Sequence, residues 1–162
     1  IYKMKKETNY KFLFLGYNKS KTTLINFLKK KKILVKNLSR QITLKDLRDI
    51  DLVISFGYKK ILNKTLLKKL KRPAINLHIS YLPYNRGAHP NFWSFIDNTP
   101  KGVSIHEIDP GIDTGKIIFR KKIKINPYKK NFSTFKKTHA YLINQVEELF
   151  IKKFKKILTK NV

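Results

Sequence analysis

Asn76, His78 and Asp113 are the side chains of this sequence whose types and spacing best suit chemistry. Asn76 and His78 stand two positions apart at the end of an apolar run, and Asp113 lies in a glycine-rich segment further along. An amide N–H can donate to a developing oxyanion, an imidazole can move a proton, and a carboxylate can hold the imidazole or accept a proton through water. None of the three is a strong nucleophile. They therefore suit acyl transfer to an amine that belongs to the substrate.

Each of these residues also has a purely structural explanation. An asparagine at a strand end is often a turn former, and a lone histidine there is often a hydrogen-bonded structural group. Asp113 precedes Thr-Gly and could simply close a turn. A metal site made by His78, His89 and His106 is a further alternative. The sequence has no HxH or HExxH spacing, so we predict no metal.

The apolar pattern indicates the elements that position these residues. Short apolar runs predict buried strands at residues 10–16, 33–36, 52–57 and 74–78. Apolar residues at helical spacing predict helices within 18–32 and 62–71. Strands that alternate with helices are typical of an α/β fold with a parallel, doubly wound sheet. Because such sheets bind ligands at the carboxyl ends of their strands, we expect Gly16, Gly57, Asn76 and His78 at one edge.

The second half of the chain adds further elements. Residues 90–98 predict a helical turn or two, 102–108 a half-buried strand, 109–115 a loop and 116–125 another strand. From Ser133 onward, apolar residues at steps of three and four predict one long amphipathic helix, with Ser133 as its N-cap. No repeat or linker composition interrupts the chain, so we predict a single domain spanning residues 1–162.

Composition limits the class of protein. A hydrophobic fraction of 41% can supply a core, so the chain is not disordered despite its formal net charge of +27. The absence of cysteine excludes disulfides, thiol nucleophiles and zinc–thiolate sites, and it fits a reducing compartment. The longest apolar runs are far too short to span a bilayer. We therefore expect a cytoplasmic protein that does not bind membranes.

The high positive charge is also seen in nucleic-acid-binding proteins, but the kind of basic residue favours another explanation. Only five of the 37 basic residues are arginine, and Lys, Ile and Asn are all abundant. Their codons are AT-rich, so a genome-wide drift would place lysines on solvated faces everywhere. A dedicated nucleic-acid surface more often uses arginine forks and stacking aromatic rings. We predict only weak, salt-sensitive attraction to polyanions.

Two motifs taken together identify a resemblance. "NLHISYLPYNRG" followed by "GVSIHEIDPGIDTG" resembles the folate-dependent formyltransferases, and the similarity covers residues 10–125. The resemblance implies a Rossmann-like fold, with a mostly parallel twisted sheet, flanking helices and a long C-terminal helix. It also implies 10-formyltetrahydrofolate as the formyl donor. The catalytic asparagine, histidine and aspartate of the family match Asn76, His78 and Asp113. We hypothesise that Asn76 and protonated His78 stabilise the tetrahedral oxyanion, while Asp113 orients His78 and relays the amine proton.

The resemblance also implies which residues bind the two substrates. In the family, backbone groups of two loops hold the pterin ring of the donor. The matching donor-binding residues are Gly57, Tyr58, Ile61, Leu62, Asp109, Gly111 and Ile112. The predicted acceptor-binding residues are Tyr17, Lys19, Arg86, His89 and Trp93. For Trp93, a structural role as the anchor of a helix on the core is an equal alternative.

The acceptor predicted from this resemblance is the primary amine of an amino sugar or of a nucleotide-linked amino sugar. Methionyl-tRNA and a purine-pathway amine are alternatives within the family. The family member of the purine pathway, glycinamide ribonucleotide transformylase, has a glycine-rich phosphate-binding loop after the first strand. Tyr17 and Lys19 interrupt that pattern here, which disfavours a ribonucleotide acceptor. A basic, non-catalytic nucleic-acid-binding module on the same fold is an alternative from another class. The retained Asn76, His78 and Asp113 disfavour such a binding module. For the oligomeric state, a homodimer is an open alternative.

Overall fold

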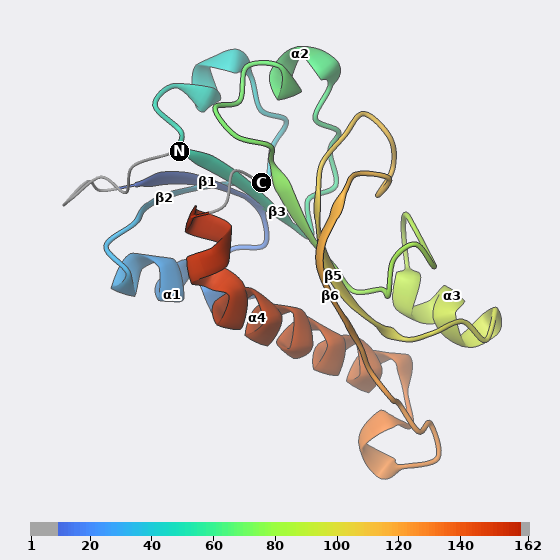
Figure 1. The fold of residues 1–162 in the computed structure, drawn as a ribbon. Helices are drawn as coiled ribbons and strands as arrows, with labels where there is room; N and C mark the ends of the chain where they lie inside the picture. Colours follow the sequence, from blue (N-terminus) through green and yellow to red (C-terminus); the bar gives the residue numbers. More distant parts are fainter. Residues whose placement is uncertain (1–9, 160–162) are drawn as a thin grey trace.

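Short apolar runs separated by helices build a central sheet with a helical layer on each face (Figure 1). The computed structural model describes residues 10–159, so the two ends of the predicted 1–162 domain lie outside the described residues. The elements, in chain order, are β1 (Lys11–Gly16), α1 (Leu24–Lys30), β2 (Leu34–Leu38), η1 (Leu44–Leu47), β3 (Leu52–Phe56), α2 (Lys64–Leu67), β4 (Ile75–His78), α3 (Pro90–Ile96), β5 (Gly102–Glu107), β6 (Ile117–Lys122), η2 (Lys130–Phe132) and α4 (Phe135–Thr159).

The six strands pair in the order β2-β1-β3-β4-β5-β6. The pairs β1–β2, β1–β3 and β3–β4 are parallel, as expected for strands that alternate with helices. The pairs β4–β5 and β5–β6 are antiparallel, so the sheet is mostly parallel, as the family resemblance implies, and not parallel throughout. No helix crosses back between β5 and β6, and the long connection from β4 to β5 returns the chain in the opposite direction. The fold is a Rossmann-like α/β fold with a mostly parallel sheet.

Both faces of the sheet are buried, which explains the continuous apolar runs of its central strands. Alternate residues of β1 point to opposite faces. Phe12 and Phe14 join the core cluster beneath α1 and α4, whereas Leu13 and Leu15 join a second cluster that includes Leu62 of the loop before α2. Figure 1 shows α1 and α4 on one face of the sheet, with η1 and α2 on the other.

The C-terminal helix confirms the predicted amphipathic pattern, but its start is corrected. Leu142, Val146, Phe150 and Phe154 recur at four-residue steps on its buried face. The helix begins at Phe135, and the backbone N–H of Lys137 donates to Thr134 Oγ1 at 3.2 Å. Ser133, the predicted N-cap, instead donates to the carbonyl of Lys130 at 3.0 Å. Thr134 therefore has the capping role, because it immediately precedes the first helical turn.

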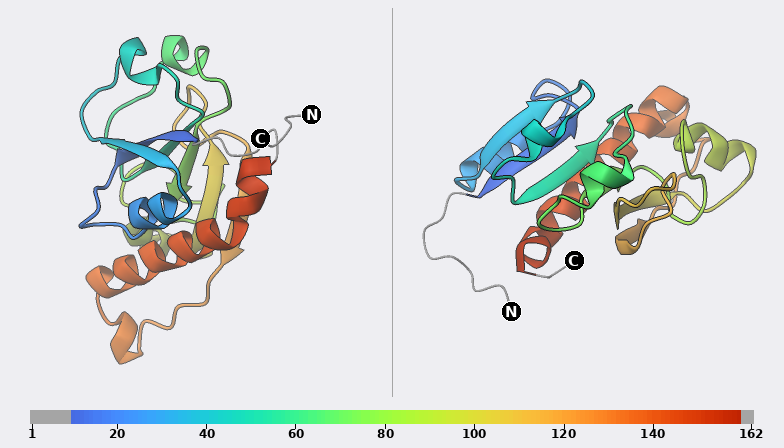
Figure 2. Two further views of the ribbon diagram at one scale, coloured as in Figure 1. Left: turned by 90° about the vertical axis from the view of Figure 1, so that its left-hand side faces the viewer. Right: turned by 90° about the horizontal axis from the view of Figure 1, so that it is seen from above.

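The predicted turn of helix after residue 89 is α3, which packs beside the N-terminal end of α4 (Figures 1 and 2). Asn91 of α3 donates to the carbonyl of Phe135 at 3.2 Å and to Thr138 Oγ1 at 2.9 Å. These bonds fix α3 against α4, so α3 is a rigidly placed element of the connection between β4 and β5.

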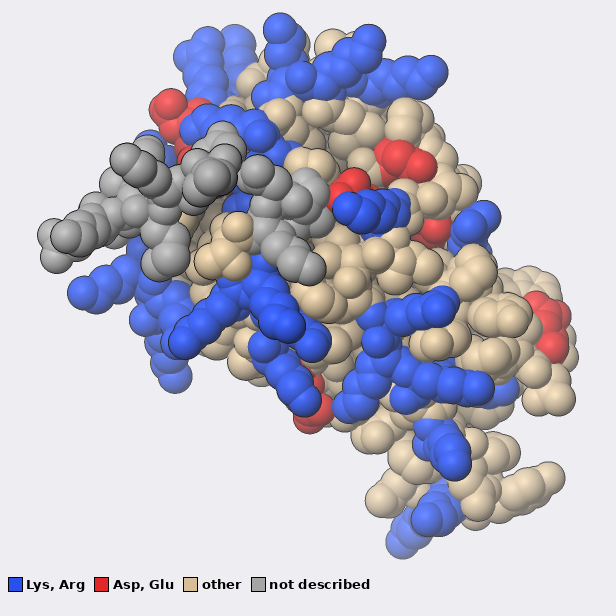
Figure 3. All heavy atoms as spheres, in the orientation of Figure 1, with Lys and Arg blue, Asp and Glu red and all other residues tan. Residues whose placement is uncertain are grey.

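On the face in view in Figure 3, lysines and arginines lie in several groups rather than on one element, with few acidic side chains between them. Within residues 10–159, no helix is both long and apolar enough to cross a bilayer.

Candidate functional site

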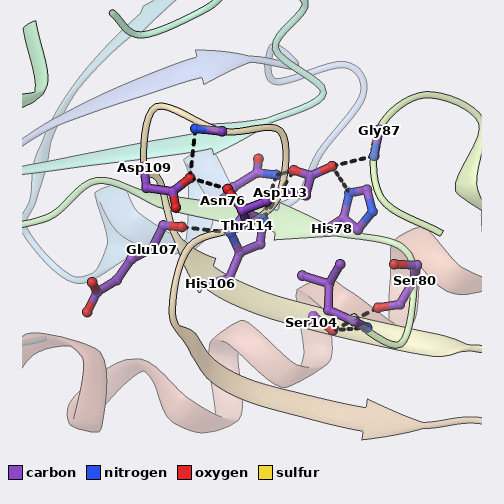
Figure 4. A network of polar contacts seen from close by, with 12 residues as sticks. Asn76, His78, Ser80, Gly87, Ser104, His106, Glu107, Asp109, Asp113 and Thr114 are labelled. Atoms are coloured by element: carbon purple, nitrogen blue, oxygen red, sulfur yellow. Dashed lines mark hydrogen bonds and ion pairs between the residues drawn. The ribbon is translucent and has the colours of Figure 1, made fainter. Parts of the chain in front are cut away.

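The candidate site lies where β4 ends at the carboxyl edge of the parallel strands. Asn76 and His78 have the same parity on β4, and both side chains point toward the loop that carries Asp113 (Figure 4). The antiparallel pairing of β4 with β5 places His106 directly opposite Asn76 and Ser104 opposite His78. The residues that the sequence analysis selected are therefore brought together, and the adjacent strand adds a second histidine.

Asp113 reaches the cluster because the loop between β5 and β6 folds back over the strand ends. Its backbone is in the left-handed region, at φ 50°. Asp109 braces the loop from within, since its Oδ1 accepts from the backbone N–H of Gly111 at 3.0 Å and from Thr114 Oγ1 at 2.6 Å. At Gly115, a Cβ atom would lie 1.9 Å from the carbonyl oxygen of Glu107, so only glycine fits there. The loop is thus shaped by its own residues.

The Asp113 carboxylate is the centre of the cluster. Its Oδ2 accepts from the backbone N–H of Gly87 at 2.8 Å and lies 3.6 Å from His78 Nδ1. Its Oδ1 accepts from Asn76 Nδ2 at 3.3 Å and lies 3.3 Å from His106 Nε2. Burial alone would raise the pKa of Asp113, but the contact with His106, the charge of His78 and the Gly87 amide outweigh it and lower the pKa to about 2. Asp113 is therefore ionised at neutral pH.

His78 is held at both ring nitrogens. Its Nδ1 faces Asp113, and its Nε2 lies 3.1 Å from the backbone carbonyl oxygen of Asn85. Only 7% of His78 is exposed, and this burial lowers its pKa, although Asp113 and the Asn85 carbonyl act in the opposite direction. The neutral ring is therefore favoured in the free protein. The protonated His78 of our hypothesis must then gain its proton during the reaction.

His106 is a member of the cluster that the sequence analysis considered only as a metal ligand. Its Nδ1 donates to the carbonyl of Glu107 at 2.7 Å, which leaves Nε2 as the acceptor for Asn76 Nδ2 at 3.2 Å. Only 2% of His106 is exposed. The signal for this role was the alternation in "GVSIHE", which places Ser104 and His106 on one face of β5. The strand pairing that brings this face beside Asn76 was not evident from the sequence.

The loop after β4 is fastened to β5 and β6 beside the cluster. Ser104 Oγ donates to the carbonyl of Ser80 at 2.8 Å and accepts from the backbone N–H of Leu82 at 3.1 Å. Arg120 of β6 donates to the carbonyl of Leu82 at 2.8 Å. These bonds anchor the start of the loop that presents Asn85 and Gly87 to His78 and Asp113.

The residues predicted to bind the donor lie on two loops at the same edge as the cluster. In the loop after β3, Ile61 is 72% exposed, and Leu62 is buried in the core. Tyr58 packs against the core cluster that contains Leu62, and so does Ile108 at the start of the loop that carries Asp113. In that second loop, Ile112 is 68% exposed. Each of the two predicted donor-binding loops therefore carries one exposed aliphatic side chain.

Gly57 and Tyr17 join the loop after β3 to the loop after β1. Gly57 has φ 67°, and a Cβ atom there would lie 2.4 Å from the Tyr17 ring. The Tyr17 ring in turn packs edge-on against Phe56, with ring centroids 4.9 Å apart. Tyr17, predicted to bind the acceptor, thus packs on the core, and burial raises its pKa. Lys19, on the same loop, lines an open hollow of about 480 Å³ together with Asn18.

The other predicted acceptor residues form a separate group after β4. Arg86 is exposed in the loop, and His89, at φ 54°, stands at the entry to α3. Trp93 is 46% exposed on α3 and packs edge-on against Phe92, with ring centroids 5.3 Å apart. β3 lies between β1 and β4 in the sheet, so Tyr17 and Lys19 are set apart from this group.

The three histidines of the alternative metal site are not brought together. His78 and His106 lie with ring centroids 6.1 Å apart, whereas His89 stands at the entry to α3. Among residues 10–159, no group of three or more His, Cys, Asp or Glu side chains is arranged to hold a metal ion.

A Rossmann-like sheet with a partly buried Asn–His–Asp cluster at its carboxyl edge defines the class of protein, and sequence comparison gives the family. The chain belongs to the formyl transferase family, whose sequence profile matches residues 15–160. Its structure is similar to that of the formyltransferase PseJ from Anoxybacillus kamchatkensis, with 39% sequence identity and a TM-score of 0.80. The similarity covers 90% of this chain and 75% of that one. PseJ is described in complex with UDP-4,6-dideoxy-4-formamido-L-AltNAc and tetrahydrofolate.

Curated relatives include enzymes with different acceptors. The GDP-perosamine N-formyltransferase of Brucella melitensis is 32% identical over 105 residues, which are 64% of this chain and 40% of that protein. The methionyl-tRNA formyltransferase of Thermodesulfovibrio yellowstonii is 44% identical over 77 residues, which are 47% of this chain and 25% of that protein. The matched part of this chain thus spans less than half the length of either relative.

Proposed function

We propose that this protein transfers a formyl group from 10-formyltetrahydrofolate to the primary amine of an amino sugar, either free or linked to a nucleotide. The observation that carries the proposal is the convergence of Asn76, His78 and Asp113 at one strand end. The 39% identity to PseJ, described with a formamido sugar nucleotide and tetrahydrofolate, supports both the donor and the acceptor class.

In this proposal, Asn76 is the oxyanion donor. Asp113 fixes the side-chain amide of Asn76 with its N–H groups toward the cluster, because a carboxylate accepts from nitrogen and would repel the amide oxygen. Both N–H groups have acceptors in the free protein, Asp113 and His106. We propose that one of them exchanges its acceptor for the formyl oxygen when the donor binds, and so stabilises the negative charge that develops there.

His78 and Asp113 have separate roles in proton transfer. With a pKa of about 2, Asp113 is a weak base at neutral pH, so we assign it to holding His78 and stabilising a positive charge on the ring. His78, whose pKa burial lowers, is the better acceptor for the proton released when the acceptor amine forms its bond to the formyl carbon. The proton then passes to the nitrogen that leaves, so the donor departs as tetrahydrofolate.

The loops after β3 and β5 are the proposed donor-binding surface. Gly57, Tyr58, Ile61 and Leu62 form one side, and Asp109, Gly111 and Ile112 form the other. When bound, the donor supplies an activated formyl group. We assign its pterin recognition to backbone groups of these loops, with Ile61 and Ile112 packing on the ring. We assign the acceptor to the side of Arg86, His89 and Trp93. Tyr17 and Lys19, which lie apart from that group beyond β3, stay predicted acceptor contacts.

The test is an assay for tetrahydrofolate release and for the formylated product. The protein is incubated with 10-formyltetrahydrofolate and nucleotide-linked or free amino sugars. Asn76→Ala should bind the donor normally but lose turnover by a factor of about 10² to 10³. Asn26→Ala, which truncates an exposed amide on α1, is the matched control and should keep full activity. Near-normal turnover of Asn76→Ala would contradict the assignment.

Methionyl-tRNA is the second candidate acceptor, because the match to a methionyl-tRNA formyltransferase reaches 44% identity. Including formyl-acceptor tRNA in the same assay separates the two. Turnover with the amino sugars alone supports our proposal, and turnover with the tRNA alone overturns its acceptor. RNA binding without detectable donor binding would instead indicate a non-catalytic basic module.

A further inference from the structure

A line of hydrogen bonds connects the end of α3 to the imidazole of His78. Thr99 Oγ1 donates to Asn85 Oδ1 at 2.5 Å, and the backbone carbonyl of Asn85 lies 3.1 Å from His78 Nε2. Thr99 is itself held at the end of α3, where its backbone N–H donates to the carbonyl of Ser94 at 3.1 Å. Lys101 Nζ donates to the carbonyl of Thr99 at 3.0 Å. Asn85, whose carbonyl faces His78, is therefore held by residues outside β4.

The conformation of Asn85 depends on this support. Its backbone has φ 54°, in the left-handed region that asparagine tolerates better than most residues. In this conformation its carbonyl turns back across the loop toward the ring of His78. Its side chain is the only part of Asn85 that reaches Thr99. A change at either end of this hydrogen bond would release the carbonyl to rotate away from the ring.

We propose that Thr99 and Asn85 are positioning residues, which hold the His78 imidazole in the orientation and protonation state needed for proton transfer. The expected effect on catalysis rests on the proposed function, whereas the expected effect on the His78 ring does not. Neither Thr99 nor the Asn85 side chain contacts the Asn76 and Asp113 groups. Both act through the backbone carbonyl of Asn85.

The chemistry of the ring shows why this carbonyl matters. A neutral imidazole has one N–H and can donate to only one partner, whereas the protonated ring has two. The two nitrogens of His78 face acceptors, the Asp113 carboxylate and the Asn85 carbonyl, and His106 is the other titratable group beside the ring. Two acceptors in place stabilise the ring when it takes up a proton. If the carbonyl moved away, its part of that stabilisation would be lost.

Purified Thr99→Val, Thr99→Ser and Asn85→Gly variants test the proposal. Valine keeps the shape of threonine but cannot donate, and serine keeps the hydroxyl. Glycine keeps the left-handed backbone but removes Oδ1. Thr65→Val, at an exposed position of α2, is the matched control. If Thr99→Val does not fold, Asn85→Gly breaks the same hydrogen bond from the other side.

The first readout is the titration of His78 followed by NMR of its ring nitrogens, without any substrate. Thr99→Val and Asn85→Gly should lower the pKa of His78 and alter its ring signals, while Thr99→Ser and Thr65→Val should resemble the parent protein. The second readout is turnover. Loss of ring alignment should reduce kcat by about tenfold to 10²-fold with little change in donor KM, and the acidic limb of the pH profile should move with the NMR titration.

The two readouts separate failure of this inference from failure of the proposed function. An unchanged His78 titration in folded Thr99→Val and Asn85→Gly overturns the positioning role, even if the protein is an active formyltransferase. A changed titration in a protein that transfers no formyl group to any acceptor leaves the positioning of the ring in place and overturns the proposed function.

Discussion

At the scale of the residue, Asp113 is the group on which the others depend. It contacts the side chains of Asn76, His78 and His106 and the backbone of Gly87, which come from two strands and a loop. Removing its charge should therefore disturb oxyanion donation and proton transfer together. An asparagine at this position is the sharpest test, because it keeps the size of the side chain and tolerates φ 50°.

Asp113→Asn should fold and bind the donor but lose turnover by about 10²-fold or more, since the general base His78 loses the charge that orients its ring and stabilises its protonated form. Steady-state assays and donor titration would measure the two properties. Asp49→Asn, at an exposed position whose backbone is also left-handed at φ 59°, is the control and should keep full activity. Equal activity of the two variants would contradict the central role of Asp113.

The pKa of Asp113 also predicts how stability depends on pH. Because folding lowers this pKa to about 2, the carboxylate stabilises the folded state above its ordinary pKa near 4. That contribution should disappear as pH falls from about 4 to about 2. The difference in free energy of unfolding between the parent protein and Asp113→Asn should be constant above this window and shrink within it. Urea unfolding at a series of pH values would measure it, and a difference that grows toward low pH would contradict it.

His106 should prove functional although it need not touch a substrate. Phe at this position would fill the buried space but could not accept from Asn76 or contact Asp113. We expect His106→Phe to lower kcat by about tenfold or more, because the Asn76 amide loses one of its two acceptors. Circular dichroism would check that the variant is folded. An unchanged kcat in the folded variant would show that His106 is not needed to orient Asn76 and Asp113.

At the scale of the element, most strands and helices could be predicted because the strands are short apolar runs and the helices repeat apolar residues at helical spacing. Asn76 and His78 could be placed at a strand end for the same reason, and the family motif indicated Asp113. The antiparallel entry of β5 could not be predicted, since an amphipathic strand has the same pattern in either direction. His106 was missed as a partner of Asn76 as a result, because its place depends on which strand β5 pairs with. The Thr99–Asn85 contact depends on the course of a loop, which has no period.

A buried carboxylate connects α1 to α4 and gives a prediction for these elements. Glu147 of α4 accepts from the hydroxyls of Thr22 and Thr23, at 2.6 and 2.5 Å, and is 6% exposed. Glu147→Ala should destabilise the protein by about 2–3 kcal/mol, because it leaves these two hydroxyls without their acceptor. Urea unfolding would measure this change. Glu148→Ala, at the exposed neighbouring position, should cost far less, and a similar cost for both would contradict the role of this contact.

At the scale of the whole molecule, the net charge of +27 should oppose folding. Lysines are spread over the surface in view in Figure 3, so most of the repulsion is between solvated charges that salt screens. We expect the Tm to rise as sodium chloride increases from about 10 mM to about 300 mM, where the Debye length is shorter than the spacing of most surface charges. Differential scanning calorimetry would measure the rise, and choline chloride should produce the same rise. A fall in Tm with salt would show that attractive ion pairs outweigh the repulsion.

The pairing of Asn76 with His106 has a consequence for how the chain tolerates change in length. The two residues face each other across β4 and β5, so the cluster exists only in this one register. A slip of one residue would turn both Ser104 and His106 to the opposite face of the sheet. The connection from residue 79 to residue 101 contains loops at its surface, where insertions are well tolerated. Insertions in that connection should therefore be tolerated away from Asn85, Gly87 and Thr99, which contact or support the cluster. A single deletion within β5, in contrast, would dismantle the cluster while leaving most of the core sequence intact.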